Sequence, residues 1–354
     1  MQVHTMDLEE ACRLGRVERI ETDYRFPAPT LECVGYRLPD YRYAGSGDLF
    51  LYALQSEGHV LFVDCGPMNM TDRQWFSQTV ERHTEDGGDA VLFLTHYHFD
   101  HMGESGWFSR QGFTCYASSE SELLASIDVE TFTVLVGGRR QTPIQQIREY
   151  AQFQCDLLSL NPKIEHVPER TAIDCGGWHF RTMLLPGHAL GHTGLITEDK
   201  QLLFSGDSLG KWPPIFAFGL DGHDGAAAIE SWQHLKGLPL EWVITAHEGP
   251  IEGAEVIQKE LSRQIDAVGS KAMRVLEEIR QMPGSMTPCD FVVERKGESA
   301  IAEAAASRKY LNALNVQHYL AFLEFLYDYE QVRRRQDDDG AVLYEPARFS
   351  TFFA

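Results

Sequence analysis

The segment Val91-Leu92-Phe93-Leu94-Thr95-His96-Tyr97-His98-Phe99-Asp100-His101 carries the strongest structural signal in the chain. Its first four residues are apolar, as in a buried strand. The six residues from His96 to His101 contain three imidazoles and one carboxylate, the side chains that zinc and related metals prefer. Crowded neutral imidazoles gain little from packing, and protonated ones repel each other. We therefore predict a metal ion, or a pair of ions, at the end of a strand.

Three further segments place a ligand-type side chain directly after an apolar strand pattern. They are His188 after residues 179–185, Asp207 after 201–205 and His247 after 242–246. In layered sheets the strands fix positions, while the loops at their ends supply the chemistry. The four strand ends could therefore converge on one edge and form one site.

The pattern HxHxDH at 96–101, followed in order by His188, Asp207 and His247, resembles that of the metallo-β-lactamase-fold hydrolases. The resemblance covers about residues 25–250. It implies an α/β (α+β) fold, a four-layer αβ/βα sandwich that carries a dinuclear metal site at one edge. It also implies ligands for each ion, which are His96, His98 and His188 for the first metal, Asp100, His101 and His247 for the second, and Asp207 as the bridge between both.

The bridging carboxylate of Asp207 separates the chain from most antibiotic-hydrolysing members of that family. It places the chain nearer glyoxalase II, the acyl-homoserine lactonases and the RNA- and DNA-processing branches. Two metals lower the pKa of a water that bridges them, and the hydroxide attacks a carbonyl or phosphoryl centre. Asp100 is expected to be catalytic, because it can accept a hydrogen bond from the nucleophile while it binds metal. The ligand set predicts two divalent ions, with zinc favoured and iron or manganese as alternatives.

Three residues near these ligands have candidate supporting roles. Asp64, in Val-Asp-Cys-Gly, resembles the family's buried acid and is expected to support a ligand rather than to bind metal. His192 either supports a ligand in the same way or is a polar turn residue. Tyr97 lies between ligands, where lining the substrate pocket and packing the loop are equally consistent with the sequence.

The loop that follows Asp207 is the best candidate for a wall of the substrate pocket, because it starts beside the metals. Lys211 could bind an anionic group of the substrate, although a solvated lysine explains it equally well. The apolar candidates in this loop are Trp212 and Phe216.

The domain organisation is predicted as a catalytic domain over 1–254 and a second region over 255–354. Residues 119–165 have helical spacing and are expected to form a helical insertion that could act as a lid. The second region looks mainly helical and ends in a hairpin pattern, which resembles a winged-helix-like appendage. Three arginines start this hairpin, but three aspartates follow at 337–339, so shielding of the active site or a homodimer contact is favoured over a nucleic-acid site.

The composition also limits the partners and the compartment. The chain has 354 residues and a formal net charge of −21, a field that repels nucleic acid and anionic membranes. Its seven cysteines are scattered and form no CxxC pair, as expected of reduced intracellular thiols. The sequence shows no secretory signal and no apolar run long enough to cross a bilayer. We predict a cytoplasmic protein without a membrane partner.

Three functions are compatible with these patterns. The favoured one is a dinuclear metallohydrolase that cleaves a thioester, or another ester or lactone, of a small acyl substrate. A metal-dependent nuclease or phosphodiesterase is the second. A regulatory protein that keeps the metal site without catalysis is the third, and the complete ligand set weighs against it.

Overall fold

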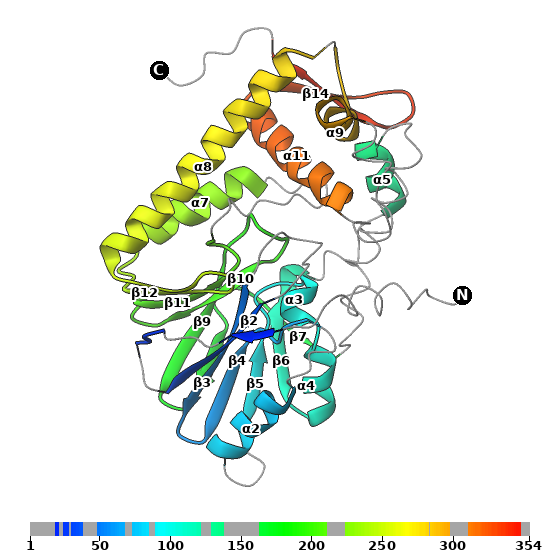
Figure 1. The fold of residues 1–354 in the computed structure, drawn as a ribbon. Coiled ribbons are helices and arrows are strands. Elements are labelled where there is room, and N and C mark those ends of the chain that lie inside the picture. The colour runs from blue at the N-terminus through cyan, green and yellow to red at the C-terminus, as the bar shows by residue number, and fades with distance from the viewer. Residues whose placement is uncertain are drawn as a thin grey trace, which may run out of the picture.

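The computed structural model describes most of the chain. The described residues are 18–20, 24–27, 30–37, 48–67, 73–84, 89–121, 129–137, 163–210, 224–282, 284–297 and 311–347. They form two large sheets, a two-stranded hairpin and helices that cover the sheets (Figure 1). Of the helices in this part of the chain, none combines the length and the apolar composition that crossing a bilayer requires.

The first sheet has seven strands that follow one another in chain order. They are β1 (Glu18–Ile20), β2 (Leu31–Arg37), β3 (Asp48–Ser56), β4 (His59–Val63), β5 (Ala90–Phe93), β6 (Thr114–Ser118) and β7 (Glu165–Val167). Strands β1 to β4 pair antiparallel, and β4 to β7 pair parallel. The parallel half places the carboxyl ends of β4 and β5 at the same edge.

The second sheet has six strands in the order β13-β12-β11-β10-β9-β8. They are β8 (Ala172–Cys175), β9 (Trp178–Leu184), β10 (Thr193–Thr197), β11 (Leu202–Gly206), β12 (Trp242–Thr245) and β13 (Gly249–Glu252). Strands β11 and β12 are parallel and the other pairs are antiparallel. The strands predicted after residue 178 therefore agree with the structure to within one residue at each end.

Alternation along the strands builds the layers. Leu61 and Val63 of β4 face the second sheet, whereas Phe62 faces the helices α2 (Arg73–His83) and α4 (Ser105–Gln111). The Phe62 ring meets Phe76 and Phe108 edge-on, with centroids 5.3 Å away in both cases. Full burial of such a ring contributes about 1.5–3 kcal/mol.

The other outer layer covers the second sheet. Leu203 of β11 faces α7 (Asp224–Lys236) and α8 (Ala254–Arg280), while its neighbours on either side face the first sheet. The order of layers is therefore helix, sheet, sheet, helix. The predicted four-layer αβ/βα sandwich is confirmed.

The C-terminal region consists of α8, α9 (Pro288–Lys296), α11 (Leu311–Asp328) and a hairpin of β14 (Val332–Gln336) and β15 (Val342–Pro346). Helix α9 begins at a capping box: Thr287 Oγ1 accepts from the Asp290 amide at 3.0 Å, and the Asp290 carboxylate accepts from the Thr287 amide at 3.2 Å. Proline at the first helical position completes this start signal.

One apolar core joins this region to the sandwich. Trp232 of α7, Leu261 of α8 and Leu320 of α11 belong to the same buried cluster as Leu203 of β11. The boundary expected after residue 254 falls at the first residue of α8, and packing is continuous across it. The described helix of the predicted insertion, α5 (Val129–Gly137), lies against α9 (Figure 1).

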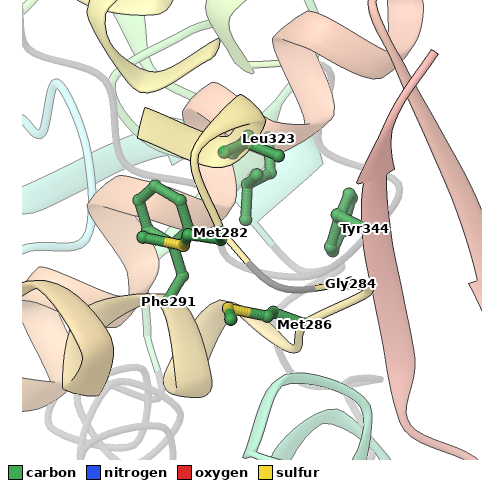
Figure 2. Close-up of a pocket in the computed structure, with 7 residues that line it drawn as sticks. Met282, Gly284, Met286, Phe291, Leu323 and Tyr344 are labelled. Atoms are coloured by element: carbon green, nitrogen blue, oxygen red, sulfur yellow. The ribbon is translucent and has the colours of Figure 1, made fainter. Parts of the chain in front are cut away.

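A small apolar pocket lies between the end of α8, α9, α11 and β15 (Figure 2). It is lined by Ile279, Met282, Gly284, Met286, Phe291, Leu323 and Tyr344. None of these seven residues is one of the predicted metal ligands.

The arginine triplet of the hairpin is divided by strand alternation. Arg334 points inward and forms an ion pair with Glu324 of α11 at 2.5 Å, and it stacks over the Tyr327 ring at 4.4 Å. Glu324 is buried and also accepts a hydrogen bond from the Tyr344 hydroxyl. Arg333 and Arg335 are exposed. The middle arginine therefore serves internal packing.

We predict that Arg334→Leu lowers the free energy of unfolding by on the order of 3 kcal/mol, because it leaves the buried Glu324 carboxylate without its cation. Arg333→Leu, at an exposed position of the same strand, is the matched control and should change stability by less than about 0.5 kcal/mol. Urea denaturation measures both. Equal losses in the two variants would show that the pair does not stabilise the hairpin.

Candidate metal centre

Seven side chains predicted as ligands meet at one end of the sandwich. His96 to His101 follow β5, and the other three side chains follow β9, β11 and β12. The structure brings them into two groups, within each of which the ligand atoms lie within 4.8 Å of one another. The groups are His96, His98, His188 and Asp207, and Asp100, His101 and His247.

The ligand atoms of the first group lie close enough together to share one ion. His98 Nδ1 lies 2.9 Å from His96 Nε2 and 3.0 Å from His188 Nε2. Asp207 Oδ2 lies 3.4 Å from His188 Nε2. Zinc–nitrogen bonds of about 2.0–2.1 Å place tetrahedral ligand atoms about 3.3 Å apart. The separations in this group are close to that value.

The second group shares the same carboxylate. Asp100 Oδ2 lies 3.4 Å from both His101 Nε2 and His247 Nε2. Asp207 Oδ1 lies 3.5 Å from His101 Nε2, and Asp207 Oδ2 lies 3.3 Å from His247 Nε2. Because Asp207 also touches His188 of the first group, its carboxylate stands between the two groups.

The donor atoms fit a cation. His101 Nε2 and Asp207 Oδ1 are buried, and neither has a hydrogen-bond partner in the described part of the chain. A buried polar atom left unsatisfied costs about 1–3 kcal/mol. A divalent ion between these atoms would remove that cost. Nitrogen and oxygen donors suit zinc, iron and manganese.

Hydrogen bonds on the far side of the His96 and His247 rings fix which of their nitrogens faces the site. The Asp64 carboxylate can only accept, so the Thr95 hydroxyl donates to Asp64 Oδ2 at 2.9 Å. His96 Nδ1, 3.0 Å from Thr95 Oγ1, is then left to donate to that hydroxyl. His247 Nδ1 donates to the Asp48 carbonyl at 2.6 Å. The Nε2 atoms of both histidines therefore point into the site.

Asp64 forms a hydrogen bond to His101 of the second group. Its Oδ2 accepts from His101 Nδ1 at 2.8 Å, and its Oδ1 accepts from the Thr95 amide at 2.8 Å. The residue has φ of 60° and is buried. It lies in the supporting position that the sequence analysis predicts, one hydrogen bond behind a ligand.

His192 supports the bridging residue. Its Nε2 accepts a hydrogen bond from the Asp207 amide at 3.1 Å, and burial lowers the pKa of the ring to about 3, so the ring is neutral and can accept. Gly206, with φ of 50°, makes this contact possible: a Cβ there would lie 2.9 Å from His192 Nε2 and 2.7 Å from Thr95 Oγ1.

Electrostatics differ between the two groups. Burial lowers the pKa of His98 to about 4 and holds the pKa values of His96 and His188 well below the usual range. Burial also lowers the pKa of His247, but Asp207 and Asp100 outweigh it and raise that pKa to about 10. Without metal, a proton therefore takes the place of a cation in the second group.

The remaining predicted residues have different outcomes. Tyr97 is buried in the apolar core outside the first sheet, so it packs the loop there. Lys211, Trp212 and Phe216 lie outside the described residues. Sequence reasoning missed Thr95, whose only signal was its place directly before the first histidine.

Sequence reasoning also missed the buried Glu104 carboxylate. Its Oε2 accepts from two guanidinium nitrogens of Arg73 at 2.8 Å. The pair joins the start of α2 to the chain just after the ligand run. Only the position of Glu104 three residues beyond His101 hinted at such a role.

Comparison with known proteins agrees with this geometry. The model of the metallo-beta-lactamase superfamily matches residues 42–247. The chain belongs to this superfamily. A hydroxyacylglutathione hydrolase of Bdellovibrio bacteriovorus is 28% identical over 158 residues, which are 44% of this chain and 47% of that protein. The chain thus matches about half the length of this curated relative.

Two solved structures show that superfamily members share the fold beyond the matched domain. A beta-lactamase domain protein from Burkholderia ambifaria has a TM-score of 0.70 at 20% identity, over 96% of this chain and 100% of its own. A metallo-beta-lactamase family protein from Thermus thermophilus has a TM-score of 0.64 at 19% identity, over 90% and 99%. The likeness therefore extends through the C-terminal helices.

We predict that Asp64→Asn weakens the binding of one of two divalent ions about 10–100-fold, because the amide no longer orients His101 through a carboxylate. Metal content after dialysis against a buffered chelator measures this. Asp174→Asn is the matched control: Asp174 pairs with His179 at 2.9 Å on the surface and should have no effect. Retention of both ions by Asp64→Asn would contradict the supporting role.

For the metal-free protein we predict a maximum of stability near pH 6.5. As pH falls toward 4, His98 becomes protonated in the unfolded chain but stays neutral in the folded protein. The free energy of unfolding therefore decreases. As pH rises toward 10, folded His247 holds a proton that the unfolded chain releases, and stability decreases again. Urea denaturation of chelator-treated protein between pH 4.5 and 9 tests both slopes. A flat profile would contradict these pKa shifts.

Proposed function

We propose that the protein is a dinuclear metal-dependent hydrolase that cleaves a thioester, or another carboxylic ester or lactone, of a small acyl compound. The observation that carries the proposal is the Asp207 carboxylate, which lies 3.3–3.5 Å from histidines of both groups. A carboxylate placed between two groups of donor atoms can bind an ion on each side. The likeness to a hydroxyacylglutathione hydrolase supports a thioester as the substrate class.

The chain's own residues supply the rest of the chemistry. When bound, two divalent ions activate water as a nucleophile and polarise the substrate carbonyl. Asp100 is buried, and although burial raises its pKa, His101 and His247 outweigh this and keep it well below the usual range. The ionised Asp100 carboxylate can therefore accept a hydrogen bond from the attacking water.

No thiol near the described ligands competes for this role. Cys65 donates its Sγ hydrogen to the His101 carbonyl at 3.1 Å. Burial, together with Glu104 and Asp64, raises the pKa of this thiol well above its usual range. The thiol stays protonated at neutral pH, where it is a poor nucleophile. An attack by activated water is thus favoured over a covalent enzyme intermediate.

The charge of the chain bears on its substrate, and its cysteines bear on its compartment. The net charge of −21 disfavours binding of a polyanion, and Arg334 of the hairpin is already paired with Glu324. We also propose a cytoplasmic location, because the seven cysteines are scattered and form no CxxC pair. We therefore favour ester cleavage over phosphodiester cleavage.

We predict that the metal-loaded protein hydrolyses members of a panel of glutathione thioesters, acyl-CoA thioesters and lactones. Asp100→Ala should lower kcat/KM by at least about 100-fold, because it removes both a ligand and a proton acceptor. Asp174→Ala, a surface substitution, is the control and should keep full activity. A phosphodiester and single-stranded RNA belong in the same panel. Turnover of these substrates alone, or of none, would contradict the proposal.

A further inference from the structure

The chain that leaves the bridging residue is held by the helical layer. Asp207 is followed by Ser208, Leu209 and Gly210 before the described segment ends. The indole Nε1 of Trp232, on α7, donates to the Ser208 carbonyl at 2.8 Å. Trp232 is fully buried, so this contact is shielded from water. The first residue after Asp207 is therefore fixed by a helix outside the sheets.

Helix α8 holds the same segment two residues later. Gln264 donates its amide Nε2 to the Gly210 carbonyl. Arg263 donates to that carbonyl as well, at 2.8 Å, while Glu260 holds the Arg263 guanidinium at 2.5 and 2.8 Å. Two consecutive residues of one helix thus converge on a single backbone oxygen.

Gln264 is an unusual residue for its position. It is 0% exposed, and its neighbours along the buried face of α8, Leu261 and Val268, are apolar. Its Oε1 has no hydrogen-bond partner in the described part of the chain. Burying an unsatisfied amide oxygen costs free energy, so an apolar side chain would serve packing better. What glutamine adds there is its Nε2 donor, which bonds the Gly210 carbonyl and, at 3.1 Å, Glu260 Oε1 of the same helix.

We infer that Gln264 is a positioning residue for the metal centre. By fixing Gly210, it holds the path of residues 207–210 and keeps the Asp207 carboxylate between the two histidine groups. His192 accepts a hydrogen bond from the Asp207 amide itself. The inference rests on the proposed role of Asp207 as the shared ligand. Helix α8 lies outside the matched residues 42–247, so a residue beyond the family domain would help to position the site.

The test compares two glutamines of α8 that both donate to a backbone carbonyl. Gln264→Met keeps the volume and removes the donor. Gln258→Met is the matched control. Gln258 donates to the Lys236 carbonyl at the end of α7 at 2.9 Å, and not to the segment that follows Asp207. Each variant is loaded with Co²⁺, and the visible spectrum and the dissociation constant of the more weakly bound ion are measured.

The expected result is a change in the Co²⁺ absorption bands and at least about tenfold weaker binding of one ion in Gln264→Met, with Gln258→Met unchanged. Arg263→Met, which removes the second donor from a partly exposed position, should shift both readouts in the same direction by less. It keeps the test decisive if Gln264→Met does not fold.

Unchanged spectra and affinities in the Gln264 and Arg263 variants would overturn the inference. So would equal changes in the Gln258 control, since a loss of helix stability would then explain them. The outcome is separable from that of the proposed function. Ester hydrolysis by the unaltered protein tests the function, whereas the Co²⁺ readouts need no substrate.

Discussion

The structure depends on one electrostatic constraint: imidazoles and carboxylates are buried together at one end of the sandwich. Ring nitrogens of His96 and His188 lie 2.9 and 3.0 Å from His98 Nδ1, and the carboxylates beside them are largely withdrawn from water. Such an arrangement is costly unless cations lie between the groups. The strand ends of both sheets fix the positions of these side chains. Hydrogen bonds from Asp64 and the Asp48 carbonyl fix the orientation of His101 and His247.

Asp207 lies where the two groups of predicted ligands meet. Its side chain touches both groups of histidines, and its backbone is held by His192. The residues that follow it are held by α7 and α8, which share one apolar core with α11. The C-terminal region is therefore packed as a continuation of the sandwich, and its helices reach the chain beside the metal centre.

Much of the site was predictable because four of the predicted ligands lie within the run 96–101 and each of the others follows an apolar strand pattern. The run from His96 to His101 indicates metal by itself, and the later ligands complete a resemblance to a family, which implied the fold. Thr95 and the Asp48 carbonyl were not predictable, because backbone acceptors and pairs distant in sequence leave no pattern. Gln264 looked like an ordinary helical residue. The role of Tyr97 could not be read from the sequence, since packing and pocket lining favour the same aromatic residue. The structure places it in the apolar core.

We expect two ions to share the Asp207 carboxylate, and anomalous diffraction from crystals of the metal-loaded protein would locate them. The expected result is two peaks about 3.5–4 Å apart, one beside His96, His98 and His188 and the other beside Asp100, His101 and His247, with Asp207 touching both. A single peak, or ions bound elsewhere, would rule out the shared carboxylate.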